Sequence, residues 1–192
     1  TQSLTGVGNI PLFEADNDTN DPIVATVTVI PSNDETDPSL TCEGSSIEFT
    51  ITVNPTAQVD PEDSLDLCNG DTAVVDFTTS NGGVDSVTTY SWEITDGDSV
   101  FASGALTGEG NINLPVANDT NADLVATVTV TPTYTNDGVD CTGPSEEFTI
   151  TVSPTAQVEQ VEDIVVCNGD EVAEIEFDTT SENDIAYSWS ID

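Results

Sequence analysis

The sequence predicts an all-β fold, built from tandem β-sandwich domains of about 100 residues each. Residues that favour strands, chiefly Val, Ile, Thr and the aromatics, are abundant, and methionine is absent. Pro, Gly, Asn and Asp interrupt these runs about every 8 to 12 residues, a spacing typical of sandwiches rather than of alternating strands and helices. Long identical strings also recur at a nearly constant offset, which indicates a repeated domain.

The repeat sets the expected domain boundaries. Residues 48–53 and 147–152 both read Glu-Phe-Thr-Ile-Thr-Val, and residues 68–71 and 167–170 both read Cys-Asn-Gly-Asp. We therefore expect the C-terminal part of one repeat, then one complete sandwich, then the N-terminal part of the next repeat. These three segments are residues 1–55, 56–154 and 155–192.

Two interpretations of the partial repeats stay open. The chain is either a window from a much longer array, or a subunit whose partial repeats complete one another between molecules by strand exchange. The sequence favours the first interpretation, because a chain rarely begins and ends inside a domain.

Four strands of the complete repeat each follow from a local pattern. Residues 73–77 and 87–94 alternate apolar with polar side chains, as strands with one buried face do. Residues 124–130 alternate Val with Ala and Thr, and residues 148–152 place Phe, Ile and Val on one face. Thr on the opposite faces suits a solvated sheet surface.

The charge balance excludes several classes of partner. The chain has no lysine, arginine or histidine, against 37 aspartates and glutamates. Without cationic side chains it can neutralise neither nucleic-acid phosphates nor anionic lipid head groups. We therefore expect no nucleic acid and no direct membrane contact. The formal charge of −37 must be balanced by solvent cations, which points to a saline, divalent-rich exterior.

The same composition argues against an enzyme. No imidazole is present as a general base, and no side-chain amine is present to form a Schiff base. Paired carboxylates can hydrolyse glycosides, but with so many acids a close pair is inevitable, and a small sandwich has little room for a deep pocket. No stretch approaches the ~18 apolar residues of a spanning helix, and the N-terminus lacks the features of a signal peptide.

Each repeat carries one tryptophan, Trp92 or Trp189. We expect both in the core between two sheets; the alternative is a platform on which a sugar ring stacks. Residues 90–98 read Tyr-Ser-Trp-Glu-Ile-Thr-Asp-Gly-Asp, which resembles the Tyr-x-Trp-x-Phe-Gly-Asp-Gly signature of polycystic-kidney-disease (PKD) domains. Ile94 and Thr95 depart from the usual Phe and Gly.

The whole chain is similar to a narrower group of repeats. The segments that carry this similarity are residues 108–112, 126–132, 141–144, 148–154 and 166–170. They resemble the PKD-like, immunoglobulin-like repeats of giant cell-surface adhesins of Bacteroidota, the gliding-motility adhesins among them. The resemblance implies immunoglobulin-like sandwiches in a secreted, very long surface filament, and it implies this architecture more specifically than any adhesive target.

The chain has four cysteines, each close to a glycine in an expected loop, which is the setting of a structural disulfide outside the cytosol. We expect Cys68 to pair with Cys141, which leaves Cys42 and Cys167 for partners outside the chain or in neighbouring repeats. One argument favours bridges between neighbours instead, because these loops should lie at opposite poles of an immunoglobulin-type sandwich. Without histidine, a metal role for the cysteines is not expected.

Clusters of Asp and Asn are the candidate metal sites, since Ca²⁺ takes about 6–8 oxygen ligands. No loop has the Gly and distal Glu of an EF-hand, and solvated turns explain the same composition. Further carboxylates lie at the repeat junctions, in residues 60–63 and 159–163, where a cation would also stiffen the array. The candidate calcium ligands are Asp16, Asp18, Asp21, Asp96, Asp98, Asp119 and Asp123.

Several triplets of Asp, Ser or Thr, and an apolar residue look like the acceptor pattern for O-glycosylation of exported Bacteroidota proteins. Chance triplets are also expected in a chain so rich in these residues. The candidate attachment points are Ser64, Thr72, Ser86 and Ser99.

These observations together predict a structural role. We expect stalk repeats of a long extracellular adhesin or filament, which project a distal adhesive element and transmit load during adhesion or gliding. The expected partners are neighbouring repeats, further copies in a filament, and a distal surface or polysaccharide. The alternative is an accessory module that binds polysaccharide beside a secreted protein, which exposed aromatic side chains would favour.

Overall fold

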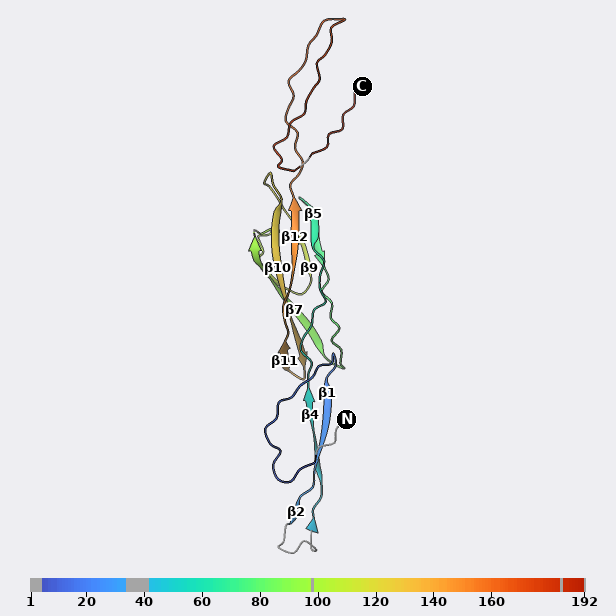
Figure 1. The fold of residues 1–192 in the computed structure, drawn as a ribbon, viewed down its shortest axis with the longest axis vertical. Coiled ribbons are helices and arrows are strands. Elements are labelled where there is room, and N and C mark those ends of the chain that lie inside the picture. Colours follow the sequence, from blue (N-terminus) through green and yellow to red (C-terminus); the bar gives the residue numbers. More distant parts are fainter. Residues whose placement is uncertain (1–4, 34–41, 98, 184, 192) are drawn as a thin grey trace. The chain divides into compact units, whose positions relative to one another are not determined.

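Figure 1 shows the computed structural model of the chain, which describes residues 5–33, 42–97, 99–183 and 185–191. These residues form strands and loops and no helix, so the predicted all-β class is confirmed. No helix in the described ranges is therefore long and apolar enough to cross a membrane. The strands are β1 (Ile23–Val29), β2 (Ser32–Asn33), β3 (Cys42–Glu43), β4 (Ile47–Val53), β5 (Leu65–Cys68), β6 (Thr72–Val75), β7 (Val87–Gly97), β8 (Thr107–Glu109), β9 (Ile112–Pro115), β10 (Leu124–Asn136), β11 (Val139–Thr142) and β12 (Glu146–Ser153).

The chain divides into two compact units, and both are discontinuous in sequence. The first comprises Thr1–Gln58, Ser80–Thr88 and Thr133–Gly143, and the second comprises Val59–Thr79, Thr89–Pro132 and Pro144–Asp192. Strands β7 and β10 each contribute residues to both units. The repeat boundaries of the sequence do not follow this division, so they stay predictions.

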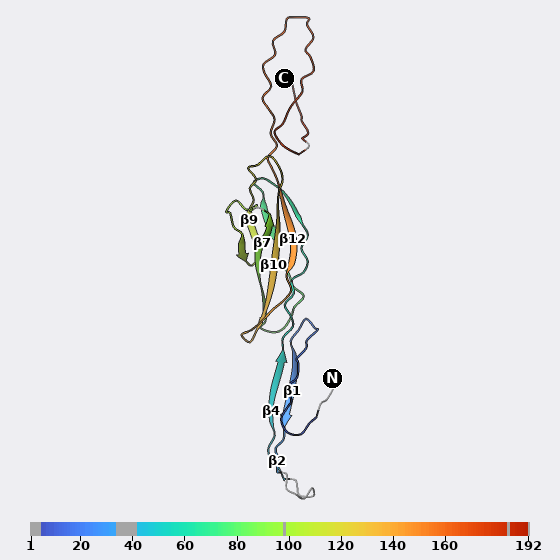
Figure 2. The same cartoon turned by 60° about the vertical axis from the view of Figure 1, so that its left-hand side comes forward.

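The second unit has the two-layered character of a β-sandwich. Its larger sheet has the strand order β5-β12-β10-β7-β8, while β6 and β9 pair separately. Figure 2 shows β10 and β12 side by side in the larger sheet. Val75 and Ile112 of the smaller sheet share one apolar core with Val128 and Ile150 of the larger sheet.

The alternating patterns explain why β10 and β12 face this core. Val128 of β10 lies opposite Phe148 of β12 in the antiparallel register, and both side chains are buried. The threonines that alternate with the buried residues along each strand face outward and are partly exposed. Burial of each large apolar side chain stabilises the fold by roughly 1.5–3 kcal/mol, so the period-two pattern fixes which face lies inside.

Strand β10 is longer than the pattern at residues 124–130 predicts. It pairs with β12 as far as Val130 and with β11 from Thr133 onward, so Pro132 lies where the partner changes. Proline cannot donate to a strand ladder, so it suits a place where the pairing with one partner ends and that with the next begins. A two-residue turn with positive φ, at Asp137 and Gly138, then closes the β10–β11 hairpin.

The described part of the N-terminal partial repeat, residues 5–33 and 42–55, is here called the N-terminal half-repeat. Its strands β1 and β4 pair in the same register as β10 and β12, with Val27 opposite Phe49 where the complete repeat has Val128 opposite Phe148. The repeated sequence therefore folds into the same strand pair.

The C-terminal half-repeat, residues 155–183 and 185–191, also keeps the local geometry of the complete repeat. Its Phe177 and Tyr187 rings lie 5.5 Å apart at 40°, and the Phe77 and Tyr90 rings lie 5.5 Å apart at 44°. Local packing thus persists where the described residues form no strand ladder.

Candidate functional site

The turn after β9 is organised by one buried asparagine, Asn118. Its side-chain Nδ2 donates to the carbonyls of Ala122 at 2.8 Å and Val152 at 2.6 Å. Its Oδ1 accepts from the backbone N–H and the hydroxyl of Thr120, at 2.9 and 2.7 Å. Both donors of the amide and its acceptor are therefore satisfied, which is what a side chain only 2% exposed requires.

Around this turn the complete repeat meets the C-terminal half-repeat. Asn69 accepts from the Asn118 backbone N–H at 2.9 Å and donates to the Thr155 hydroxyl at 3.0 Å. The Glu182 N–H donates to the Asn121 carbonyl at 2.9 Å, and the Asn183 side chain donates to Asp123 at 2.8 Å. We call this set of contacts, centred on residues 118–123, the second joint.

Hydrogen bonding at the second joint also sets the charge state of its carboxylate. The hydrogen bonds from Asn183 and then from Ser153 lower the pKa of Asp123 below its ordinary value. These donors stabilise the ionised form, so Asp123 is held as an anion that accepts across the joint.

The same joint occurs where the N-terminal half-repeat meets the complete repeat. Asn17 donates to the carbonyls of Asp21 at 2.9 Å and Val53 at 2.8 Å, and it accepts from Thr19. The Gly82 N–H donates to the Asn20 carbonyl at 2.9 Å, as Glu182 does to Asn121. We call this set, centred on residues 17–21, the first joint.

Two side chains of the β10–β11 hairpin add to the first joint. The Tyr134 hydroxyl donates to the Gly82 carbonyl at 2.9 Å, and its ring is 1% exposed. Asn136 donates to the Asn54 side chain at 2.7 Å. The unpredicted extension of β10 therefore delivers these residues to the junction between repeats.

The two joints differ at one contact, where the acidic side chain comes from the turn in the first joint and from the opposite repeat in the second. In the first joint a side chain added at Gly82 would meet the carboxylate of Asp21. In the second joint Glu182 occupies the position of Gly82, and Ala122 occupies that of Asp21. Each joint thus places one acidic side chain at this contact rather than two, which avoids both a clash and a like-charge pair.

The predicted calcium ligands lie at these turns and elsewhere on the surface. Asp16, Asp18 and Asp21 flank the first joint, Asp119 and Asp123 the second, and these five are exposed. Asp96 is exposed on β7, and Asp98 lies outside the described residues. In the part of the chain that the structure describes, no three carboxylates or thiols form a metal-binding group. The calcium hypothesis stays a prediction.

One of the acids predicted at the repeat junctions, Glu62, lies close to other carboxylates. Burial raises the pKa of Glu62, and the neighbouring charges of Asp60, Asp63 and Asp76 raise it further. Asp60 also accepts from the Thr78 hydroxyl at 2.7 Å. Like charges gather here without a protein cation to offset them.

The structure differs from the predicted Cys68–Cys141 disulfide. All four cysteines, including Cys42 and Cys167, are free. Cys68 lies at the end of β5, opposite Ser153, level with the start of β10, whereas Cys141 pairs with Tyr134 near the end of β10. The predicted Cys68–Cys141 pairing therefore gains no support from the structure and stays a prediction.

The candidate glycosylation residues differ in accessibility. Ser64 and Thr72 are exposed, while Ser86 and Ser99 are partly buried. The Ser86 hydroxyl donates to the carbonyls of Gly82 and Gly83 at 3.2 and 3.1 Å. Thr72 and Ser64 therefore offer the more accessible hydroxyls.

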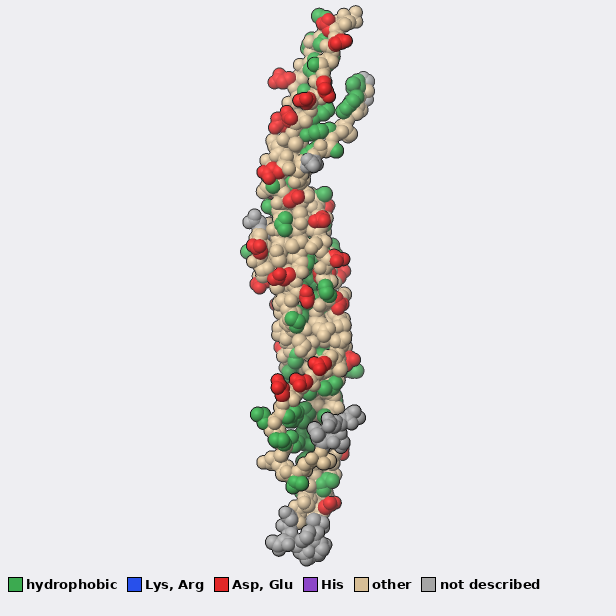
Figure 3. All heavy atoms as spheres, in the orientation of Figure 1, with side chains coloured by type: hydrophobic (Ala, Val, Ile, Leu, Met, Phe, Trp, Pro, Cys, Tyr) green, Lys and Arg blue, Asp and Glu red, His purple; other side chains and the backbone are tan. Residues whose placement is uncertain are grey.

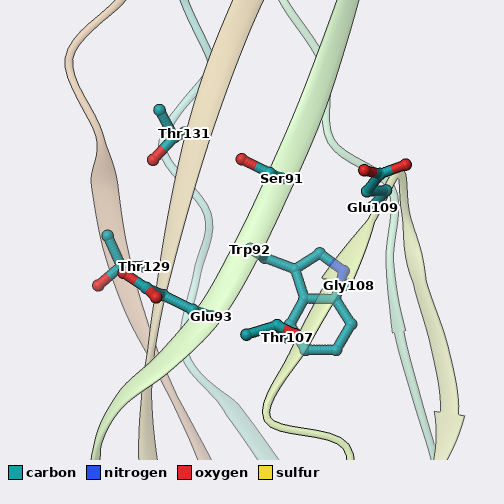
Figure 4. Close-up of a pocket in the computed structure, with 8 residues that line it drawn as sticks. All are labelled: Ser91, Trp92, Glu93, Thr107, Gly108, Glu109, Thr129 and Thr131. Carbon is teal, nitrogen blue, oxygen red and sulfur yellow. The ribbon is translucent and has the colours of Figure 1, made fainter.

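The two tryptophans lie in different surroundings. Trp92 is 5% exposed and packs edge-on against Phe101, with ring centroids 5.5 Å apart, whereas Trp189 is 72% exposed. Figure 4 shows the Trp92 ring beside Gly108, while Ser91 and Glu93 project to the other side of β7. The buried ring of Trp92 offers no stacking platform to a sugar.

The surface carries negative charge alone. Figure 3 shows acidic side chains spread over the visible face, and the sequence contains no lysine, arginine or histidine. Hydrophobic side chains of the N-terminal half-repeat, Phe49 and Val24 among them, are also exposed.

No family model, curated protein or solved structure matches this chain.

The sequence pointed to the joint turns through their Asp residues, as candidate cation ligands, and that interpretation stays a prediction. The side chains that organise these turns, Asn17 and Asn118, were not among the predicted site residues. The recurrence of Asn-Asp-Thr-Asn at residues 17–20 and 118–121 was a visible signal for a repeated turn.

Proposed function

We propose that this chain is a section of the stalk of a long extracellular adhesin or surface filament, built from PKD-like, immunoglobulin-like repeats. The observation that carries the proposal is the joint. Asn17 and Asn118 make the same pair of hydrogen bonds to the backbone at the two ends of one complete repeat. A joint that recurs with the repeat is what a linear array of identical connections requires.

The charge supports the same proposal. Neighbouring repeats all carry negative charge, so they repel one another and favour an extended array, less strongly at high salt. The buried Trp92 gives no support to a polysaccharide-binding module. On this proposal the stalk projects a distal adhesive element from the cell and transmits load to it.

Surface labelling tests the proposal. Antibodies raised against the 192-residue chain are applied to intact cells of the organism that encodes it, with permeabilised cells and an antibody to a cytosolic protein as controls. We expect intact cells to be labelled on filaments that extend from the surface, and Fab fragments to reduce attachment to surfaces. Labelling only after permeabilisation would overturn the proposal.

A further inference from the structure

Asparagine followed directly by glycine occurs in both joints. The first joint contains Asn81-Gly82, and the second contains Asn69-Gly70. An asparagine in this setting can lose its side-chain amide without an enzyme, because glycine has no side chain to hinder the attack of its own backbone nitrogen on the neighbouring amide carbon. Whether this reaction proceeds in the folded chain depends on the hydrogen bonds that hold the two groups.

The first joint holds both reacting groups of its Asn-Gly step. The Asn81 Oδ1 accepts from the Gln58 backbone N–H at 2.6 Å, and its Nδ2 donates to the Thr56 carbonyl at 3.0 Å. The Gly82 N–H donates to the Asn20 carbonyl at 2.9 Å. The nitrogen that would attack and the amide that it would attack are therefore both fixed by partners from the preceding part of the chain.

The other side of Gly82 is held as well. Its carbonyl accepts from the buried Tyr134 hydroxyl at 2.9 Å and from the Ser86 hydroxyl at 3.2 Å. A five-membered ring can form only if the Gly82 nitrogen swings toward the Asn81 side chain, and this movement breaks these bonds. The reaction therefore requires the joint to open first, at the free-energy cost of that opening.

We propose that Asn81 is a deamidation site that the closed first joint protects, and that the reaction permanently weakens the joint once it has opened. In the open joint the Gly82 nitrogen gives its proton to a solvent base and bonds to the side-chain carbon of Asn81. The bond from this carbon to Nδ2 breaks, Nδ2 takes a proton from water, and ammonia leaves behind a succinimide ring. Water then opens the ring to aspartate or isoaspartate, so one amide and one water yield one carboxylic acid and one ammonia.

Neither product restores the closed joint. A carboxylate at position 81 has no N–H for the Thr56 carbonyl and places two acceptors against each other. Isoaspartate also lengthens the backbone just before Gly82, which moves this residue away from its partners. The new charge lies one residue from the contact of Gly82 with the Asp21 carboxylate, and the chain has no cationic side chain to offset it. The reaction thus converts a transient opening into a lasting one.

The second joint protects its own Asn-Gly step through different residues. The Asn69 side chain is held by the Asn118 N–H and the Thr155 hydroxyl, and the Gly70 N–H donates to the Val116 carbonyl at 3.2 Å. A substitution that opens one joint should therefore release one step and leave the other protected. This inference goes beyond the proposed stalk function, because the chemistry depends on the joints and not on where the chain is located.

The first test compares the folded and the denatured chain. The full chain is incubated at mildly alkaline pH in buffer and in strong denaturant, and chymotryptic peptides are then mapped by mass spectrometry. We expect Asn81 to deamidate at least about tenfold more slowly in the folded chain, because several hydrogen bonds must break first. Equal rates in the two conditions would overturn the proposal.

Crossed variants test whether each joint protects its own step. Asn17→Ala removes the side chain that orders the turn of the first joint. It should raise the rate at Asn81 severalfold and leave that at Asn69 unchanged, whereas Asn118→Ala should do the reverse. Equal acceleration at both steps in either variant would show that global unfolding controls the reaction, and the proposal would be wrong.

Hydrogen exchange tests the lasting effect on the joint. The Gly82 N–H should exchange about tenfold faster in Asn81→Asp and in isolated isoaspartate protein than in the unmodified chain. Asn113→Asp is the matched control, because it adds the same charge at an exposed position of β9, and it should exchange like the wild type. Exchange in the isoaspartate form as slow as in the unmodified chain would show that the joint closes again, against the proposal.

Discussion

At the scale of single residues, Asn118 is the side chain that orders the turn at residues 118–123. It satisfies two carbonyls and orders Thr120 from one buried position. We expect Asn118→Ala to lower the free energy of unfolding by about 2–4 kcal/mol, because several hydrogen bonds are lost and the buried Val152 carbonyl is left unpaired. Chemical denaturation measures this loss. Asn121→Ala is the control, since Asn121 takes part through its backbone carbonyl, and an equal loss there would contradict the assignment.

The exchanged side chains at the two joints predict a compensating pair. Gly82→Glu should destabilise the first joint, because the new side chain meets the carboxylate of Asp21. Adding Asp21→Ala recreates the Glu182–Ala122 arrangement of the second joint and should recover about 1 kcal/mol or more of the loss. A double-mutant cycle from thermal melts measures the coupling. Strict additivity of the two substitutions would show that the residues do not interact.

The raised pKa of Glu62 predicts how the stability of the fold depends on pH. Its pKa is raised in the folded state, so the folded protein holds this proton more tightly than the unfolded chain does. The stabilisation is therefore full below the ordinary value of 4.5 and is lost as the pH rises through the raised pKa. Melting temperature should fall over this range, and less steeply in Glu62→Gln. Glu93→Gln, which removes a charge from an exposed strand position, should keep the slope of the wild type.

At the scale of strands, position within a repeat decides what a residue contributes. Phe148→Ala should lower the free energy of unfolding of the complete repeat by roughly 3–5 kcal/mol, the usual cost of emptying a buried aromatic site. Phe49→Ala, at the matching position of β4, should cost much less in the monomer because its site is already solvated. Urea unfolding at low protein concentration makes the comparison. Equal losses would mean that the face of β4 is covered in solution.

The strands also show how far the sequence alone could predict the fold. Period-two patterns at residues 124–130 and 148–152 were sufficient for β10 and β12, because each has one buried face. The continuation of β10 to Asn136 was not predicted, since Pro132 and the polar residues after it are typical of a turn. Pro132 lies where the partner of β10 changes from β12 to β11, and strand partners are not visible in a local pattern.

The positions of the Asp- and Asn-rich turns could be predicted from the sequence, but the hydrogen bonds that their side chains make could not. Asp-rich turns suit both cation binding and backbone capping, and the choice depends on which carbonyls come near. Val152 lies 34 residues from Asn118 along the chain, so no local sequence pattern predicts their hydrogen bond. The Cys68–Cys141 pairing was inferred from a loop context in the same way, and the strand register of each cysteine is equally invisible in a local pattern.

At the scale of the whole molecule, the unbalanced charge makes stability depend on ions. We expect added Ca²⁺ to raise the melting temperature by more than NaCl of matched ionic strength does, if the carboxylates at the joints bind it specifically. Calorimetry with each salt, together with solution scattering, measures the difference. An identical response to the two salts would leave only diffuse screening, and the calcium hypothesis would then be abandoned.

The parallel pairing of β5 with β12 has a mechanical consequence. Leu65 lies opposite Ile150 and Cys68 opposite Ser153, so the first and last strands of the complete repeat run side by side in the same direction. A pull on the flanking repeats draws β5 back from its start and β12 forward from its end. Because the strands are parallel, this force slides one along the other and loads their hydrogen bonds simultaneously, in shear. The repeat would then resist stretching until those bonds break together, instead of peeling apart one pair at a time.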